Sequence, residues 1–369
     1  MKVLLSRNLF ELALSHCFDA TERKAADSFC QMSFANGELK LTTKGSFTIY
    51  EESIKTIKCD ADCDVTIKTA TILEFVKYIN SDDIILVYDN IKHTCLVSSG
   101  DKKSKLAVPQ VDLKFEEIKQ EMNDCDIFQI TNSVELVTKL NFASKFCSNN
   151  FQDHPLTNIH CEVKPDEIEL KSANGPGFYN STIKVTGSNT SEFYLPRKTP
   201  SILKNIFDSE ALEQISIDKN SIVFSSINNR LQVFIERTKD SFPDQILEWL
   251  KDDKTEEAKA KVSIYELSKA LKFFNGIFSQ SSIQCKIDNG DIELSCADDE
   301  NKIAAKETVP TESSSGQTKS SYTSKLFLDC LESLQSAWVE LSFITMQPDF
   351  ALCKMSSNDT LVLLCPAIS

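Results

Sequence analysis

Apolar and polar residues alternate in three similar segments of the chain, and each segment contains a turn. The segments begin at Gln31, Ile159 and Ile283, and they read QMSFANGELKLTT, IHCEVKPDEIELKSA and IQCKIDNGDIELSCA. An alternating run followed by a turn and a second alternating run is the pattern of a β-hairpin. Two of the turns are Asn-Gly, which suits the positive φ angles of tight hairpins, and the middle turn contains Lys-Pro-Asp. The chain is therefore predicted to contain three copies of one hairpin.

An amphipathic stretch lies before each hairpin, and a second one lies after it. Both sets space their apolar residues by three and four positions, which predicts helices with one buried face. The first set covers residues 6–18, 132–146 and 263–278. The second set covers residues 69–80, 196–207 and 323–336. Ser6, Asn132 and Ser263 open the first set as suitable N-caps, and Pro196 suits the first turn of the middle helix of the second set.

The repeat has the length of a domain. Taking Glu38, Glu167 and Asp291 as equivalent gives spacings of about 129 and 124 residues. Further alternating strands follow each second helix, so the sequence predicts an α+β fold of three repeated domains, each with two helices on antiparallel sheet. Charged stretches near Asn123 and Thr255 interrupt the pattern and define domains at 1–122, 123–254 and 255–369. Segment 310–321, PTESSSGQTKSS, has no apolar periodicity and is predicted to be a loop.

Composition indicates a soluble globular protein of two or three domains, because 41% of the 369 residues are hydrophobic and 25% are charged. No run of about 18 uncharged apolar residues occurs, so no membrane span is expected. The start resembles a signal peptide for a few residues only, since Arg7 and Glu11 interrupt the apolar run. The 13 cysteines are odd in number and scattered, which favours a reducing cytoplasm over a disulfide framework.

The sequence contains no recognisable catalytic or cofactor motif. P-loop, GxGxxG, HExxH and GxSxG patterns are all absent. Cys59 and Cys63 form one close cysteine pair, but none of the four histidines has metal-type spacing to it. Acidic clusters such as Asp298-Asp299-Glu300 could hold a divalent metal in a hydrolase, although solvated surface is the more usual reading. We therefore expect a binding or structural protein with no catalytic residue, no metal and no cofactor.

The charge distribution leaves room for one basic surface. The chain has 54 acidic and 40 basic residues, a net charge of -14, which argues against binding nucleic acid over its whole surface. Yet the stretch LPRKTPSILKNIF contains Arg197, Lys198 and Lys204 and no acidic residue. A single basic helix face is therefore compatible with the composition.

With three α+β repeats of this length, the chain resembles the bacterial sliding clamps, the beta subunits of DNA polymerase III. YLPRKTPSIL at 194–203, DSFPD at 240–244 and the ending LVLLCPAIS are similar to family segments, and the resemblance covers essentially the whole chain. It implies a homodimer closed head to tail into a ring, with helices lining the hole and sheets outside. Duplex DNA would pass through the ring independently of its sequence. The subunit would be non-catalytic and would tether the replicative polymerase.

The resemblance assigns a set of basic residues to the DNA-facing helices and their flanks. These are Arg7, Arg23, Lys24, Lys77, Lys139, Lys145, Arg197, Lys198, Lys204, Lys269, Lys272 and Lys325. Glu11, Glu135, Glu266 and Asp329 lie among them, so the lining would be mildly positive, and weak phosphate contacts would permit sliding. The alternative is that these residues are ordinary solvated helix faces.

The resemblance also implies a dimer interface between the first and third domains. Its residues would be Lys102, Lys103, Lys105, Leu106 and Val108 on one side, and Ile277, Phe278, Asp298, Asp299 and Glu300 on the other. Basic and apolar residues would then face apolar and acidic ones. Lysines on an edge strand also protect against aggregation, so this second explanation stays open.

A further implied site binds short peptides of the polymerase, the clamp loader and other partners. Its residues would be Leu156, Ala173, Gly175, Phe178, Pro243, Leu247, Leu363, Leu364, Cys365 and Pro366. The apolar members would accept leucine and phenylalanine side chains. Residues 173–178 read ANGPGF and lack the histidine and arginine usual in the family, so an altered peptide preference is expected. The competing hypothesis is a repeat-built protein scaffold without any linkage to DNA.

Overall fold

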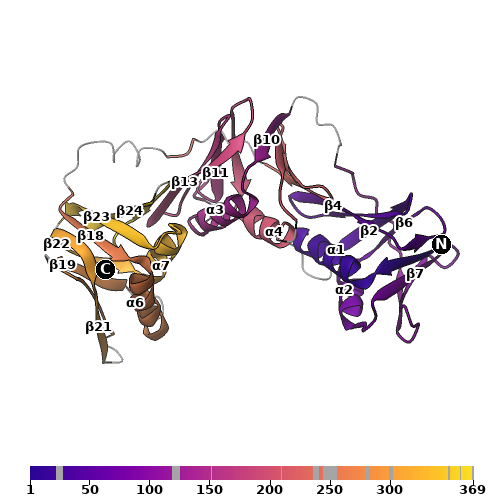
Figure 1. Ribbon diagram of the computed structural model, residues 1–369, viewed down its shortest axis with the longest axis horizontal. Helices are drawn as coiled ribbons and strands as arrows, with labels where there is room; N and C mark the ends of the chain where they lie inside the picture. Colours follow the sequence, from indigo (N-terminus) through magenta and orange to yellow (C-terminus); the bar gives the residue numbers. More distant parts are fainter. Residues whose placement is uncertain are drawn as a thin grey trace. The chain divides into compact units, whose positions relative to one another are not determined.

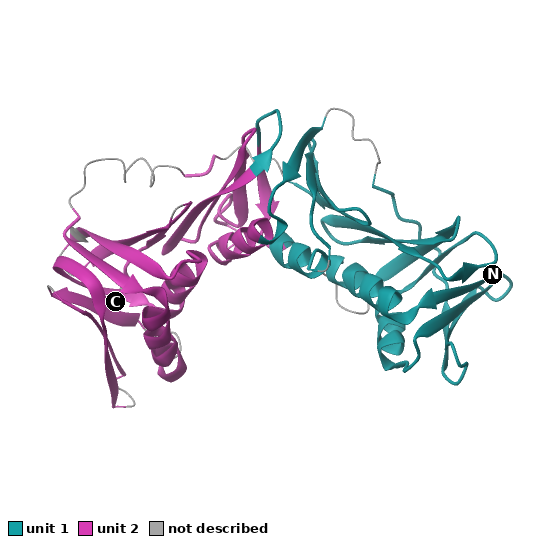
Figure 2. Ribbon diagram, in the orientation of Figure 1, with its two compact units in different colours: residues 1–134, 185–191, 199–236 teal, residues 135–184, 192–198, 237–369 magenta. Residues whose placement is uncertain are grey.

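The computed structural model describes residues 1–21, 28–118, 125–150, 152–208, 210–235, 241–243, 256–278, 282–288, 290–298, 302–347, 350–357 and 359–367. The chain forms two compact units, which Figure 2 shows in different colours. Unit 1 comprises residues 1–134, 185–191 and 199–236, and unit 2 comprises residues 135–184, 192–198 and 237–369. Residues of the predicted middle domain occur in both units, so the boundaries 1–122, 123–254 and 255–369 stay a prediction.

Unit 1 contains helices α1 (Arg7–Ala20), α2 (Thr69–Tyr78) and α4 (Thr199–Ile206). A five-stranded antiparallel sheet has the order β5 (Lys58–Cys59), β1 (Lys2–Ser6), β7 (Asp83–Asp89), β8 (Thr94–Ser99) and β9 (Lys105–Pro109). A second series of antiparallel pairings connects β6 (Cys63–Lys68), β2 (Phe29–Ala35), β3 (Glu38–Lys44) and β4 (Thr48–Lys55). It continues through β17 (Asn229–Phe234), β16 (Ser221–Ser225), β15 (Gln214–Ile217) and β10 (Asp126–Ile130).

Unit 2 contains helices α3 (Ser133–Lys145), α6 (Ile264–Ile277) and α7 (Ser324–Ser333). Its antiparallel pairings begin with β14 (Ser191–Pro196), β11 (Asn158–Val163), β12 (Glu167–Ala173) and β13 (Gly177–Thr186). They continue through β25 (Thr360–Leu364), β24 (Phe350–Ser357), β23 (Trp338–Gln347) and β18 (Ala258–Ser263). They end with β22 (Thr311–Thr323), β19 (Ser282–Asp288), β20 (Ile292–Asp298) and β21 (Ile303–Val309).

Within each unit, helices pack in pairs on the sheets. α1 and α2 contact each other in unit 1, as α6 and α7 do in unit 2 (Figure 1). Helix α6 buries Leu267, Leu271 and Phe274 along one face, which is the stripe that the three- and four-residue spacing predicts. Its N-terminus is capped because the Ser263 side chain accepts a hydrogen bond from the Glu266 backbone amide. Among the described helices, none has the length and apolar character to cross a bilayer.

The structure confirms the α+β class, the three hairpins and the six helices. The hairpins are β2–β3, β11–β12 and β19–β20. In the first, Asn36 and Gly37 have φ angles of 52° and 80°, as an Asn-Gly turn requires. The prediction for Pro196 is wrong: it ends β14, and helix α4 begins at Thr199, so Pro200 is the proline in the first turn.

The loop predicted at 310–321 is also wrong, because most of this segment belongs to β22. The strand pairs with β18 through Thr311–Gly316 and with β19 through Gln317–Thr323, so it passes from one sheet to the next at Gly316. Gly316 has a φ angle of 73°, and a Cβ atom there would lie 1.9 Å from the backbone oxygen of Glu257. Pairing with β18 along one half and with β19 along the other, rather than apolar alternation within the segment, holds this serine-rich strand in place.

Candidate partner-binding site, helix surfaces and sheet edges

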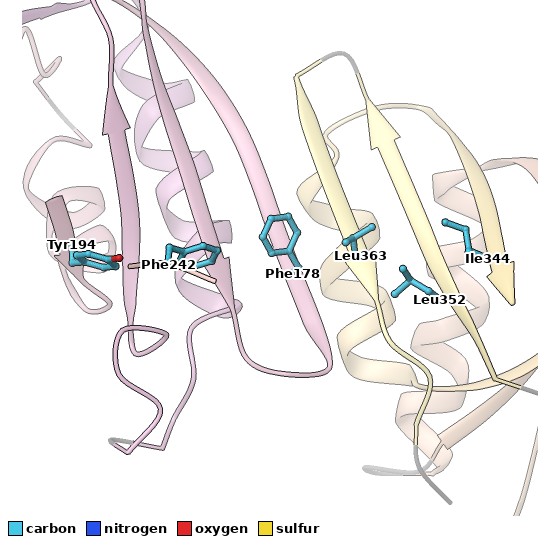
Figure 3. Close-up of a cluster of buried hydrophobic side chains, with 6 residues drawn as sticks. All are labelled: Phe178, Tyr194, Phe242, Ile344, Leu352 and Leu363. Carbon is cyan, nitrogen blue, oxygen red and sulfur yellow. The ribbon is translucent and has the colours of Figure 1, made fainter. Parts of the chain in front are cut away.

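A cluster of apolar side chains extends across several strands of unit 2. It consists of the buried residues Phe178, Tyr194, Phe242, Ile344, Leu352 and Leu363, which we call the apolar cluster. Leu156, Ala173, Leu361 and Cys365 are partly buried and pack against it. Figure 3 shows the six buried side chains as a band that runs from Tyr194 to Ile344 across the strands. The pairing of β13 with β25 makes this band continuous, because it joins residues that are far apart in the sequence.

Strand register explains why these side chains share one face. Ala173 pairs with Phe178, Phe178 pairs with Leu363, and Ile344 pairs with Leu352. Directly paired residues in antiparallel strands point to the same side of the sheet, whereas successive residues alternate. Leu364 therefore points to the opposite face from Leu363, although both are buried. The alternating direction of side chains along a strand places one leucine of β25 on each face.

Histidine 160 lies against the aromatic end of the apolar cluster. Its ring centroid is 5.4 Å from that of Phe242, with an interplanar angle of 17°, and 5.0 Å from that of Tyr194. His160 is 3% exposed, and its Nε2 is 2.8 Å from Oε1 of Glu192. The buried Nδ1 has no hydrogen-bond partner among the described residues. His160 therefore packs against the rings of Phe242 and Tyr194, and its polar contact is with the carboxylate of Glu192.

Five of the predicted pocket residues come together here: Leu156, Ala173, Phe178, Leu363 and Cys365. Gly175 is exposed, Pro243 is half-buried next to Phe242, and Pro366 is buried. Leu364 is on the other face of β25, and Leu247 lies outside the described residues. Sequence reasoning missed Tyr194, Phe242, Ile344, Leu352 and Leu361. Leu361 lies two positions before Leu363 in the same strand, which is a signal for it, but no sequence pattern brings Tyr194 and Ile344 into one band of side chains.

Backbone hydrogen bonds hold the carboxyl-terminal segment beside the apolar cluster. The Cys365 amide donates to the Pro176 carbonyl at 2.8 Å, and the Ala367 amide donates to the Ser321 carbonyl at 2.7 Å. Partial burial raises the pKa of the Cys365 thiol, so at neutral pH this side chain is uncharged and acts as an apolar neighbour. Deeper burial raises the pKa of Cys285 to about 12. Buried neutral thiols of this kind are poor nucleophiles.

Lys139 does not face DNA, and this prediction is wrong. The side chain is 5% exposed, and its ammonium lies 2.7 Å from the Glu135 carboxylate. It also donates to the Thr182 carbonyl at 2.8 Å and pairs with Asp359. Leu136, Leu140 and Ala143 bury the same stripe of α3, so the helical spacing already placed position 139 on the inner face. Two carboxylates and a carbonyl surround the ammonium and offset the cost of burying it.

Several other basic side chains on the helices are engaged by neighbouring groups. Arg7 pairs with Glu11 at 2.6 Å and donates to the Val76 carbonyl at 3.1 Å. Lys145 is 2.7 Å from Asp329 and 3.7 Å from Glu332. Three further residues have partners as well: Lys77 pairs with Glu74, Lys272 with Glu332, and Arg197 donates to Asn149. These pairs lower the positive potential of the helix faces.

Lys204, Lys269 and Lys325 are exposed and form no ion pair among the described residues. They lie on α4, α6 and α7 respectively. Lys198 precedes α4 and has partners of its own. Arg23 and Lys24 lie outside the described residues. The helices therefore have a few available cations rather than a dense basic surface.

Edge strands of the described sheets include β9 and β21. β9 pairs with β8, and β21 pairs with β20. On the β9 side, Lys105 is exposed, Val108 is buried, and Lys103 pairs with Asp101 at 3.2 Å. Lys102 occupies the turn before β9 with a φ angle of 61°, and Leu106 is half-buried in the strand. Unpaired edges of this kind can accept a further strand.

The second predicted interface segment is only partly described. Ile277 at the end of α6 is 46% exposed, and the adjacent Phe278 is 4% exposed. Asp298 ends β20 next to the β21 edge, where it pairs with Ile303. Asp299 and Glu300 lie outside the described residues. An exposed isoleucine, an acidic residue and a strand edge thus occur within the same unit.

The described ranges contain no group of three or more histidine, cysteine, aspartate or glutamate side chains arranged to hold a metal ion. All thirteen cysteines are free thiols. The acidic residue Asp298 is half-buried at the end of β20, where it pairs with Ile303.

No family model and no curated protein sequence matches the chain. Solved structures, in contrast, match it from end to end. The DNA polymerase III beta subunit of Thermotoga maritima has a TM-score of 0.84 at 14% identity, covering 100% of this chain and 99% of that one. The DNA polymerase sliding clamp of Bacillus subtilis has 0.84 at 15% identity over 100% and 99%. The Helicobacter pylori beta clamp, bound to a DNA ligase peptide, has 0.84 at 15% identity over 100% of both chains. This chain therefore has the complete fold of the bacterial sliding clamps.

Proposed function

We propose that the protein is a non-catalytic processivity clamp of the cytoplasm. Two copies close head to tail around duplex DNA and hold the replicative polymerase on its template. The observation that carries this proposal is the end-to-end likeness to solved clamps, with a TM-score of 0.84 over 100% of both chains in the Helicobacter pylori case. A scaffold that binds proteins alone would not need this complete architecture. The protein-scaffold hypothesis is accordingly not favoured.

The distribution of charge on the helices supports a sliding rather than a gripping role. Lys204, Lys269 and Lys325 are available for phosphates, whereas Lys145 and Arg7 are held by carboxylates. Each phosphate contact adds to the dependence of affinity on salt, and few contacts keep the barrier to movement along DNA low. Retention of the protein on DNA then depends on closure of the ring. Net charge of -14 on the chain discourages binding of nucleic acid elsewhere.

We place the dimer interface at the β9 edge of one protomer and the β21 edge of its partner. Lys102, Lys103 and Lys105 would face Asp298 and its acidic neighbours, and Leu106 and Ile277 would supply apolar contact. Asp298 lies where β20 pairs with the start of β21, which is exposed at Ile303. Strand addition and charge complementarity would act together in such an interface.

The apolar cluster is the proposed docking site for partner peptides. One structural neighbour is a beta clamp bound to a DNA ligase peptide. In this chain, Leu156, Ala173, Leu361 and Cys365 form a half-buried rim over the buried Phe178 and Leu363. A peptide with leucine and phenylalanine anchors would cover this rim. The polymerase, the clamp loader and repair proteins are the partners that such peptides would bring.

The decisive experiment compares circular with linear DNA. The protein should have a solution mass of twice 41.4 kDa. Once loaded onto a nicked plasmid by the clamp loader of its own cell extract, it should remain bound in high salt. Cutting the plasmid should release it, because a ring slides off a free end. A strict monomer at micromolar concentration, or equal retention on circular and cut plasmid, would overturn the proposal.

Reversing two charges tests the proposed interface. The double substitution Lys103→Glu and Lys105→Glu should weaken dimerisation at least about tenfold, because it places carboxylates opposite carboxylates. Sedimentation equilibrium measures the change. Lys55→Glu, at the exposed end of β4, is the matched control and should leave the dimer unchanged. An unchanged dimerisation constant in the double variant would move the interface elsewhere.

A further inference from the structure

The rim of the apolar cluster includes a cation that the pocket prediction did not contain. Lys354 of β24 pairs directly with Leu363 of β25. Leu363 in turn pairs with Phe178 of β13. Paired residues share a face, so Lys354, Leu363 and Phe178 form one row across three strands on the side of the sheet that carries the cluster. Leu361, also on this face, is diagonal to Lys354 and half-buried.

The Lys354 ammonium is accessible at the border of this apolar surface. Its side chain is 35% exposed, whereas the neighbouring Leu363 is 0% exposed. The aliphatic part of a lysine can lie along apolar groups while its charged end stays in water. A ligand that covers the rim would therefore meet both the leucine side chain and the ammonium.

The nearest carboxylate neutralises Lys354 only weakly. Glu256 Oε1 is 3.8 Å from the Lys354 ammonium, which is a long distance for an ion pair. Lys259 is the closer partner of the same Glu256 side chain. The hydrogen bond from Lys259 lowers the pKa of Glu256. This carboxylate therefore interacts mainly with Lys259. Lys354 consequently keeps capacity for a second carboxylate.

Two other basic side chains on this face are buried against carboxylates. Lys171 has an 8% exposed side chain and lies 3.8 Å from both Glu162 and Glu169. His160 is buried and contacts Glu192.

Lys259 lies in the same row through Ser342 and is exposed, but Glu256 pairs with it at close range. Glu340 is also exposed on this face and lies 3.9 Å from Lys259. Lys354 is thus the exposed lysine of the described row whose nearest carboxylate lies at a long distance.

We infer that Lys354 determines peptide choice, and that the apolar cluster prefers a peptide with an acidic residue beside its apolar anchors. This inference rests on the proposed function of the cluster as a peptide site. A carboxylate placed there would pair with Lys354 at the edge of an apolar surface, where the effective dielectric is lower than in water. The chain's net charge of -14 repels acidic peptides at a distance, so the preference comes from contact at short range.

The test uses matched synthetic peptides and the full-length protein. Each fluorescein-labelled peptide has a Leu-Phe anchor pair and one variable residue, aspartate, asparagine or lysine, placed in turn on either side of the anchors. Fluorescence polarisation measures the dissociation constants. For one placement, aspartate should improve binding about fivefold over asparagine, and lysine should weaken it. Raising the salt concentration should shrink the difference.

Variants of Lys354 assign the preference to this residue. Lys354→Met should abolish the difference between aspartate and asparagine, Lys354→Glu should reverse the order, and Lys354→Arg should keep it. Lys286→Met, on β19 and paired with Asp288, is the matched control and should behave as wild type. Circular dichroism melting shows that each variant is folded.

Two outcomes would overturn the inference, and they can be told apart. If the peptides bind but aspartate, asparagine and lysine forms have equal affinity, or if Lys354→Met keeps the wild-type order, Lys354 does not determine the choice and the docking site stands. If folded wild-type protein binds none of the peptides, the docking proposal itself fails and the inference fails with it.

Discussion

A chain that ends at Thr360, and so lacks residues 361–369, is expected to lose most of the stability of unit 2 and all affinity for partner peptides. The deletion removes nearly all of β25, which pairs with β13 on one side and β24 on the other. Val362, Leu363 and Leu364 are at most 1% exposed. Their loss would expose Phe178 and Leu352 and leave two ladders of backbone groups unpaired. The expected cost is more than about 5 kcal/mol.

Urea unfolding of the full-length and shortened chains measures this cost. Hydrogen exchange should also become fast in β13 and β24, because these strands lose their shared neighbour. The matched control removes only residues 368–369, which should leave stability and peptide binding unchanged. The single substitution Leu363→Ala should cost about 3 kcal/mol and weaken peptide binding without removing the strand. An unchanged unfolding midpoint for the shortened chain would show that β25 does not join β13 to β24.

Gly316→Ala is expected to destabilise the protein by roughly 3 kcal/mol or more. Gly316 has a φ angle of 73°, a conformation that L side chains rarely adopt. The added Cβ would lie 1.9 Å from the Glu257 carbonyl oxygen and 3.0 Å from Cα of Ala258. Both contacts are with backbone, so rotation of a side chain cannot relieve them. The strand β22 would have to shift at the residue where it passes from β18 to β19.

Gly276→Ala is the matched control for this substitution. Gly276 lies within α6, and a Cβ atom there meets nothing within 4 Å. Alanine should be neutral or stabilise the protein by up to about 1 kcal/mol, since it favours the helix. Thermal and urea unfolding of both variants provide the comparison. Equal stability of the Gly316→Ala variant and the wild type would mean that β22 has no constrained bend at this residue.

The helix surfaces show why charge is difficult to assign from sequence. Lys145 and its partner Asp329 are 184 residues apart, and Lys139 and Asp359 are 220 residues apart. Such pairs form only when strands and helices from distant segments meet. The sequence identifies which side chains are basic, but the folded chain decides which of them are already neutralised. Position 139 is the exception, because the apolar spacing of α3 indicated its burial in advance.

The residues of the peptide site likewise divide into those that the sequence indicated and those that only the folded chain brings together. The resemblance to sliding clamps assigned Phe178 and Leu363 to the peptide pocket, and in the structure they lie opposite each other in register. Tyr194 and Phe242 were missed because they reach the cluster from segments whose pairing depends on the whole sheet. Lys354 was missed for the same reason. Its importance comes from Leu363, its neighbour across the strands, and not from the residues beside it in the sequence.

The sequence by itself determined the local elements of this protein: three hairpins, six helices and an α+β class. Asn-Gly turns, amphipathic spacing and short-range hydrogen bonds all involve residues close together in the chain. They are therefore visible as patterns in the sequence. Only the tertiary structure decided that residues 311–323 form a strand, that Lys139 pairs with Asp359 and that Lys354 borders the apolar cluster. These outcomes depend on contacts between distant segments, whose energies exceed local propensity and have no periodic trace in the sequence.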